Sequence, residues 1–174
     1  DGSIKLIRIC FICHGNICRS PMAEFIMKHK VKELNLENKF YITSKATSSE
    51  ELGNDIHPGT QKKLIENNIP YTRHYATRVE ETDYDDFDYF ICMDDKNIRN
   101  LSYIFDDPKN KVFKLLPKDI ADPWYTGNFD ETYEDVVLKE DDFTEIVIEN
   151  DDGCKYDKAY FAYLTYDQIA LILD

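Results

Sequence analysis

The sequence predicts a single α/β domain built around a parallel β-sheet, and three observations support this fold class. The chain has 174 residues, which is close to the roughly 150 residues of one domain. Its composition is 43% hydrophobic with 12 Tyr and 10 Phe, enough to fill a core and unlike a disordered acidic chain. Strand-like and helix-like segments alternate through the first 116 residues, as in strand–helix–strand units with parallel strands.

Short runs rich in β-branched and aromatic residues predict the strands. The run at residues 89–93 is apolar throughout, as expected for a strand that is buried on both faces of a sheet. The predicted strands cover residues 4–12, 40–44, 89–93 and 111–115, and a further short strand is expected within 71–79.

Apolar periodicity and the positions of proline predict the helices between these strands. Pro21 lies where the first turn of a helix tolerates proline, and an apolar face follows it. Pro58 and Gly59 precede the second helix and Pro70 follows it. The predicted helices cover residues 21–34, 60–68 and 94–105.

Acidic residues are concentrated in the C-terminal part of the chain. Residues 130–157 contain twelve Asp and Glu and two Lys, so this segment carries −10 of the formal net charge of −13. Within it, residues 144–149 favour a strand, and the Asn-Asp-Asp-Gly that follows favours a turn. We therefore expect a hairpin within the acidic segment at 138–157 and a closing helix at 158–174, both within the single domain 1–174.

Charge and cysteine content restrict the partners and the compartment. A net charge of −13 argues against binding to nucleic acid or to an anionic membrane. No apolar run approaches the roughly 18 residues of a membrane span. Five cysteines are an odd number without framework spacing, which favours reduced thiols in the cytoplasm. We expect a cytoplasmic protein that is a monomer or a weak dimer.

Residues that carry chemistry are concentrated at positions 13–20, CHGNICRS, between the first strand and the first helix. Ligands of open α/β sheets bind at the carboxyl ends of the strands, and a helix N-terminus attracts anions. Gly15 permits backbone conformations that other residues resist, and Asn16 tolerates the left-handed region. The predicted phosphate-binding loop consists of His14, Gly15, Asn16, Ile17, Cys18 and Arg19.

Five residues separate Cys13 from Arg19 across this loop. If the loop wraps around a phosphate, the sulfur lies beneath the phosphorus, and the planar guanidinium can bind two oxygens at its edge. The loop amides, the helix dipole and Arg19 all favour the thiolate form of Cys13. Ser20 can add a hydrogen bond to the sulfur. Cys13 is therefore a candidate nucleophile, and the alternative is a chance pairing, because a cysteine and an arginine often occur at this spacing.

The same segment offers possible metal ligands in Cys10, Cys13, His14 and Cys18. A zinc site usually has a second pair of ligands downstream, and the sequence contains no such pair. We therefore predict no metal site. Cys10 and Cys92 lie in apolar predicted strands and are interpreted as core thiols.

Residues 13–24, CHGNICRSPMAE, resemble the signature of the low-molecular-weight protein tyrosine phosphatases. The resemblance covers about residues 4–137 in the same order. Chains of this family usually end soon after the Asp-Pro motif, so the comparison implies that the acidic segment 138–157 is an insertion. It implies an open four-stranded parallel sheet flanked by helices on both faces, in agreement with the predicted strands and helices. The further matching segments are Thr47-Ser48-Ser49, Gly53-Asn54, Phe87-Asp88-Tyr89, Cys92-Met93-Asp94 and Asp122-Pro123-Trp124-Tyr125.

This resemblance implies a protein tyrosine phosphatase that works through a cysteinyl-phosphate intermediate, without cofactor or metal. Cys13 would attack phosphorus, and Arg19 with the loop amides would hold the phosphate oxygens. Asp122 would protonate the leaving phenolate and then accept a proton from water. The expected substrate is a phosphotyrosine protein or a small aryl phosphate.

Supporting roles follow from the same resemblance. Asn16 and Ser20 would shape the loop and support the thiolate, and Ser44 is a weaker candidate for this network. Cys18 would either form a reversible disulfide with Cys13 under oxidation, which protects the nucleophile, or have only a conformational role in the loop.

The resemblance also places the walls of a substrate cleft. Trp124 and Tyr125 would stack on the phenyl ring of the substrate. Glu50 stands where some family members carry an aromatic residue, and this departure is expected to disfavour acidic phosphopeptides. Asp94 follows a predicted strand, where it could cap a helix or belong to the site.

Two other functions are compatible with the loop. An arsenate reductase of the same fold would need additional resolving cysteines, whereas Cys92 lies in a predicted strand and Cys154 in the acidic segment. A non-catalytic phosphate- or phosphoprotein-binding module would be favoured by the loss of Cys13, Arg19 or Asp122, and all three are present.

Overall fold

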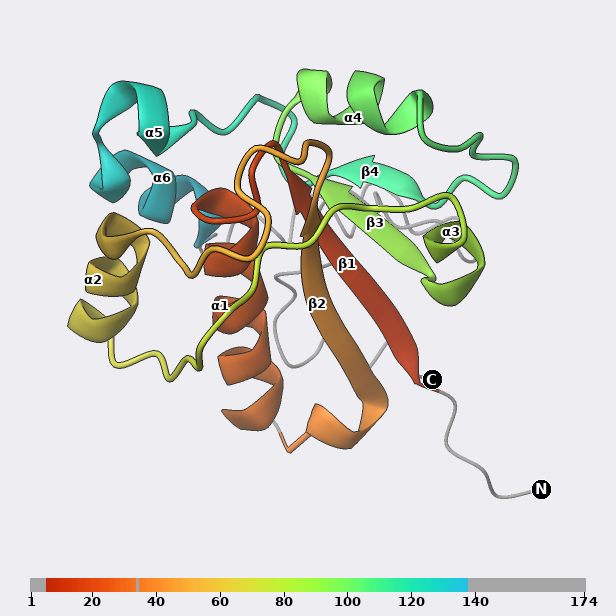
Figure 1. The fold of residues 1–174 in the computed structure, drawn as a ribbon. Coiled ribbons are helices and arrows are strands. Elements are labelled where there is room, and N and C mark those ends of the chain that lie inside the picture. The colour runs from red at the N-terminus through yellow and green to blue at the C-terminus, as the bar shows by residue number, and fades with distance from the viewer. Residues whose placement is uncertain (1–5, 34, 138–174) are drawn as a thin grey trace.

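The centre of the protein is a parallel β-sheet (Figure 1). The computed structural model describes residues 6–33 and 35–137, and in these residues the sheet has four strands in the order β2-β1-β3-β4. Each of the four main predicted strands overlaps one of them, so the prediction of an open four-stranded parallel sheet is confirmed. The strands are β1 (Ile7–Cys13), β2 (Phe40–Ala46), β3 (Tyr89–Cys92) and β4 (Val112–Lys114).

Helices connect the strands and continue the chain after β4. The longest, α1, buries the apolar face that the sequence predicts. Three short helices that the sequence does not predict, α3, α5 and α6, lie in or near acidic segments of the chain. The helices are α1 (Arg19–Glu33), α2 (Pro58–Glu66), α3 (Asp83–Asp86), α4 (Asp95–Ser102), α5 (Pro123–Thr126) and α6 (Phe129–Val136), with a 3₁₀ turn η1 at Glu37–Lys39.

The prediction of a short strand within residues 71–79 is wrong. This segment is extended, but it forms only one isolated bridge, between Arg78 and Ala46. Its backbone groups bind loops and the end of β2 instead: Ala76 N–H binds Asn54 C=O at 2.9 Å, and Val79 N–H binds Ala46 C=O at 2.8 Å. The segment therefore ties loops together and adds no strand to the sheet.

Both faces of the sheet are covered, as predicted. Along β1, Phe11 belongs to a core shared with α1 and α6, whereas Ile12 belongs to a core shared with α3 and α4. Both side chains are fully buried. Figure 1 shows α1, α2, α5 and α6 on one side of the sheet and α3 and α4 on the other.

The strand order produces a switch point next to β1. The chain leaves β1 toward α1 on one face and leaves β3 toward α4 on the other. Because β1 and β3 are neighbours, the two loops diverge at their carboxyl ends and leave a crevice, where open α/β sheets bind ligands.

The predictions for the acidic insertion at 138–157 and the closing helix at 158–174 lie outside the described residues. In the ranges that are described, no helix has the length and apolar character needed to cross a membrane.

Candidate active site

The predicted phosphate loop lies at the carboxyl end of β1, where Cys13 ends the strand and Arg19 begins α1. Its carbonyl groups accept hydrogen bonds from neighbouring segments. Thr47 N–H binds the carbonyl of Cys13 (3.0 Å), Ser48 N–H binds that of His14 (3.1 Å), and His57 N–H binds that of Ile17 (2.8 Å). Because these carbonyls are bound on the outer side, the loop N–H groups are left for its centre, as in an anion-binding nest.

Cys13 has two hydrogen-bonding partners at its sulfur. The N–H of Asn16 donates to Sγ at 3.2 Å, and Ser20 Oγ lies 3.0 Å from it. Ser20 Oγ already accepts from Asn16 Nδ2 at 2.8 Å, so its own hydrogen is free to donate to the sulfur. Both contacts favour a negatively charged sulfur.

Asn16 holds the loop in shape. Its φ of 62° is in the left-handed region, which asparagine tolerates better than most residues. The side-chain amide donates to Ser20 and to Ser44 Oγ at 2.9 Å. Its Oδ1 accepts from Thr77 N–H at 3.1 Å and lies 3.1 Å from His74 Nε2. The amide is thus fixed from both ends.

Arg19 is buried and anchored on one side of its guanidinium. Nη1 donates to Asp94 at 2.6 Å and to the carbonyl of Ile120 at 2.8 Å, while Nη2 lies 3.4 Å from Asp122. Burial alone lowers the pKa of Arg19, but the nearby Cys13 and the hydrogen bond to Asp94 more than offset this and raise it. The guanidinium stays charged where it lines the pocket.

Asp122 lies across the pocket from the loop and caps α5. Its Oδ1 accepts from the N–H of Trp124 at 3.0 Å, while Oδ2 faces Arg19. Trp124 and Tyr125 follow on α5 and are 57% and 78% exposed, so both rings are available to a ligand.

The opposite rim of the pocket is acidic. Glu50 Oε2 lies 2.9 Å from Nε2 of His14, which joins the rim to the phosphate loop. Glu51 lies beside it and accepts from Asn54 Nδ2 at 2.6 Å. Glu50 and Glu51 therefore place two carboxylates at the mouth of the pocket.

The predicted site residues gather in one place. Asn16 of the loop, Ser20 and Ser44 are buried and do not line the pocket. The pocket is lined by Cys13, His14, Gly15, Ile17, Cys18, Arg19, Glu50, Glu51, Asp122, Trp124 and Tyr125.

The described cysteines differ in their surroundings. Burial, together with nearby Cys13 and Asp122, raises the pKa of Cys18 far above its usual range. Burial likewise raises the pKa values of Cys10 and Cys92, which are core thiols as interpreted from the sequence. Cys13 and Cys18 are both free thiols here, so their reversible disulfide stays a prediction.

Among residues 6–33 and 35–137, no group of three His, Cys, Asp or Glu side chains could hold a metal ion.

Some contacts of the site were not found from the sequence. Asp94 has both roles that were considered for it, because Oδ1 caps α4 through Asn97 N–H at 2.7 Å and Oδ2 binds Arg19. Glu24 accepts from Ser44 Oγ at 2.6 Å and so extends the Asn16 network. Glu24 belongs to the CHGNICRSPMAE segment, but no spacing pattern pointed to its partner.

Comparisons with known proteins agree on one family. Residues 8–150 match the family model described as low molecular weight phosphotyrosine protein phosphatase. The low molecular weight protein-tyrosine-phosphatase PtpA of Staphylococcus aureus (strain bovine RF122 / ET3-1) is 38% identical over 151 residues, which cover 83% of this chain and 96% of that protein.

Solved structures show the same likeness. The crystal structure of YfkJ from Bacillus subtilis matches with a TM-score of 0.73 and 38% identity, covering 78% of this chain and 90% of that one. SP-PTP, a low molecular weight protein tyrosine phosphatase from Streptococcus pyogenes, matches with a TM-score of 0.69 and 41% identity, covering 75% of this chain and 86% of that one.

Proposed function

Because the chain belongs to the low molecular weight phosphotyrosine protein phosphatase family, we propose that Cys13, Arg19 and Asp122 carry out its protein tyrosine phosphatase reaction. The observation that carries this proposal is the convergence on one sulfur. Asn16 N–H and Ser20 Oγ lie 3.2 and 3.0 Å from Cys13 Sγ, and Cys13 lines the same pocket as Arg19 and Asp122.

The first step transfers the phosphoryl group to the enzyme. Cys13 Sγ attacks phosphorus as the bond to the phenolic oxygen breaks, and protonated Asp122 gives its proton to that oxygen. Arg19 and the N–H groups of the loop bind the three equatorial oxygens, where negative charge must be stabilised.

The second step releases inorganic phosphate. The Asp122 carboxylate takes a proton from water, the water oxygen attacks phosphorus, and the sulfur–phosphorus bond breaks. The sulfur leaves as a thiolate that the Asn16 N–H and the Ser20 hydroxyl stabilise. The alternatives of an arsenate reductase and a non-catalytic binding module are not favoured, because the relatives are named as tyrosine phosphatases.

Rapid acid quench tests the intermediate directly. Wild-type protein mixed with p-nitrophenyl phosphate for milliseconds should carry one phosphate on the peptide that contains Cys13, seen by mass spectrometry. The Cys13→Ser variant serves as control and should carry none. Phosphate found on another residue, or turnover with no phosphoenzyme under any quench condition, would contradict the mechanism.

Asp122→Asn should slow the reaction most for poor leaving groups. The amide keeps the cap on the Trp124 N–H but has no proton to give. We expect kcat for phenyl phosphate to fall by about 10³-fold, within the range of general acid catalysis. The fall should be smaller for p-nitrophenyl phosphate, whose leaving group needs little protonation. Equal losses for the two esters would argue against the assigned role.

The cleft is suited to phosphotyrosine in a segment that is not acidic. Trp124 and Tyr125 can stack on the phenyl ring, while Glu50 and Glu51 border the opposite side. Two unit charges 4 Å apart repel by about 1 kcal/mol in water. Because salt screens such charges, kcat/KM for a phosphopeptide with acidic flanks should rise about 2- to 5-fold between low and high salt.

Matched variants and peptides isolate the effect of the rim. A peptide with neutral flanks should change little with salt, and Glu50→Gln should flatten the response to the acidic peptide. The same slope in Glu50→Gln as in wild type would remove Glu50 from substrate selection.

The same chemistry favours the cytoplasm as the compartment. Cys13 must stay reduced to act as a nucleophile, and reducing compartments maintain thiols. Fractionation of the source cells with an antibody to the protein would test this location. The proposed reaction uses no cofactor.

A further inference from the structure

His57 lies where three parts of the site meet, although it does not line the pocket. Its backbone N–H binds the carbonyl of Ile17 in the phosphate loop at 2.8 Å. Its ring Nδ1 accepts the N–H of Gly59 at 3.0 Å and thereby caps α2. The ring also contacts Phe129, stacked at a centroid distance of 5.0 Å, and Trp124, edge-on at 5.8 Å.

Trp124 depends on such a support because it lies on a short and exposed helix. Helix α5 has four residues, between the Asp122 cap and Gly127 at a φ of 69°. Among the described residues, His57 is the aromatic ring that Trp124 contacts. The backbone N–H of Trp124 donates the 3.0 Å cap bond to Asp122 Oδ1, so a shift of the α5 backbone at Trp124 also moves the carboxylate.

The His57 ring, which supports Trp124, is itself held by packed neighbours. A side chain at Gly59 would put its Cβ 2.4 Å from Phe129 Cζ, so the Phe129 ring lies directly on the start of α2. Phe129 packs in turn against Ile17 and Cys18 of the phosphate loop. The His57 ring therefore connects a packed cluster at the loop with the exposed cleft wall.

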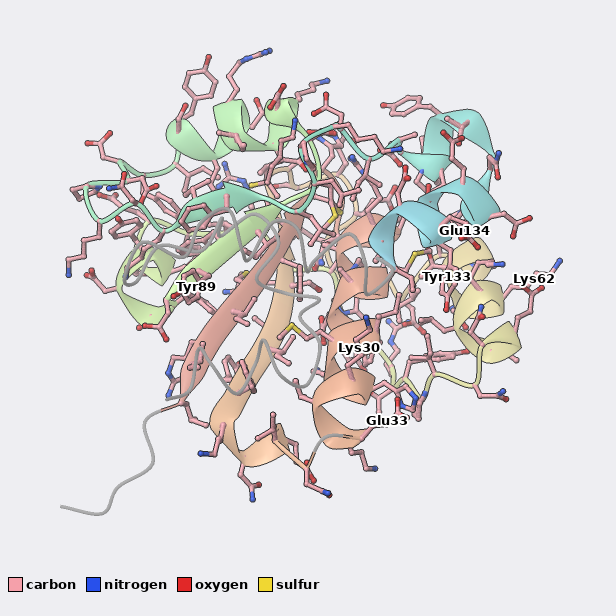
Figure 2. All side chains as sticks on the ribbon, turned by 180° about the vertical axis from the view of Figure 1, so that it is seen from behind. Lys30, Glu33, Lys62, Tyr89, Tyr133 and Glu134 are labelled. Atoms are coloured by element: carbon pink, nitrogen blue, oxygen red, sulfur yellow. The ribbon has the colours of Figure 1, made fainter. Side chains whose placement is uncertain are left out.

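Helix α2 is fixed on its other side as well. Lys63 binds Asp130 of α6 at 2.7 Å and lies over the ring of Tyr133. In Figure 2, Tyr133 and Glu134 mark α6 next to α2, with Lys62 pointing away from the helix pair. Movement of His57 relative to the phosphate loop is restrained by these contacts.

We propose that His57 is a positioning residue that holds the Trp124 wall, and through it Asp122, in place over the phosphate loop and so sets the preference for aromatic phosphate esters. This inference rests on the proposed roles of Trp124 and Asp122. The two functions of the His57 side chain are separable. The ring supports Trp124, and the Nδ1 acceptor caps α2.

Two substitutions separate the ring contact of His57 with Trp124 from its capping of α2. His57→Asn keeps an acceptor at a position where asparagine is a good helix cap, but it removes the ring. His57→Phe keeps a ring and removes the acceptor. His29→Asn is the matched control, because His29 lies on α1 and pairs with Glu33. Trp124 is the only tryptophan of the chain, so intrinsic fluorescence reports on it alone.

In His57→Asn, we expect greater quenching of Trp124 by acrylamide and a KM for p-nitrophenyl phosphate raised about 2- to 10-fold, the size of one aromatic contact. The Ki of inorganic phosphate, which needs only the loop, and the KM of an alkyl phosphate should not change. His57→Phe should restore the quenching and the aryl KM while melting at a lower temperature. His29→Asn should match wild type in every assay.

Some outcomes would overturn the proposal. Wild-type quenching and wild-type aryl KM in His57→Asn would show that the ring does not support the wall. A Ki for phosphate that rises in step with the aryl KM would indicate distortion of the loop, and failure of His57→Phe to restore the wall would indicate that the cap alone matters. The quenching experiment needs no turnover, so it decides the role of His57 even if the proposed reaction proves wrong.

Discussion

Replacing Cys13 by serine is expected to lower kcat for p-nitrophenyl phosphate by about 10⁵-fold or more, comparable to the loss of other covalent nucleophiles. The reason is chemical, since a serine hydroxyl at neutral pH is a far weaker nucleophile than a thiolate. The bonds from Asn16 and Ser20 that favour a charged sulfur cannot make the hydroxyl ionise. Steady-state kinetics with p-nitrophenyl phosphate measure the effect.

Cys13→Ser should lose activity but still bind inorganic phosphate. Serine is nearly the size of cysteine, and it is neutral, so the loop should bind inorganic phosphate as well as or better than wild type in calorimetry. Cys10→Ala, which changes a buried thiol in the same strand, should retain most of the activity. A Cys13→Ser enzyme within tenfold of wild type would exclude Cys13 as the nucleophile.

The second large effect is expected at Arg19, where lysine should lower kcat by about 10³-fold, the lower end of the range for a transition-state arginine. Lysine keeps the charge but lacks the planar fork that binds two phosphate oxygens. Nη1 of Arg19 is occupied by Asp94 and Ile120, so the remaining donors have a fixed direction that an ammonium group cannot reproduce.

At Arg19, lysine tests the role of the guanidinium geometry better than alanine does, because lysine keeps the positive charge. Removing the buried cation would leave Asp94 without its partner, which typically destabilises a protein by about 3–5 kcal/mol. The melting temperature of Arg19→Lys, measured beside its kinetics, separates folding from catalysis. Asp94→Asn is the companion variant: its amide oxygen can still cap α4, and kcat should fall less than in Arg19→Lys. If Arg19→Lys were as active as wild type, charge alone would suffice and the fork would be irrelevant.

Local features of this chain could be predicted from the sequence, and long-range contacts could not. The loop from Cys13 to Ser20 is continuous, so its residues and its place between strand and helix follow from a short segment. Asp122 is different, because spacing alone would not have selected it among 34 acidic residues, and only the family resemblance identified it.

The contacts of His74 and His57 lie beyond such patterns. His74 reaches Asn16 across 58 positions of the chain, and no local periodicity encodes that pairing. For the segment 71–79, the sequence predicts a strand that the structure does not contain. Its residues favour extended backbone, as predicted, but its N–H groups bind loops, which propensity cannot foresee.

The divergence of the chain at β1 and β3 has a consequence for how the molecule matures. Arg19 meets Asp94 and Asp122 across 75 and 103 positions of the chain, so the site joins segments from both sides of the sheet. Arg19 cannot acquire its full set of partners until the late-synthesised half of the chain has docked on the early one. A complete site is therefore a property of the finished fold, and a nascent or partly unfolded chain does not hold Arg19 and Asp122 together beside Cys13.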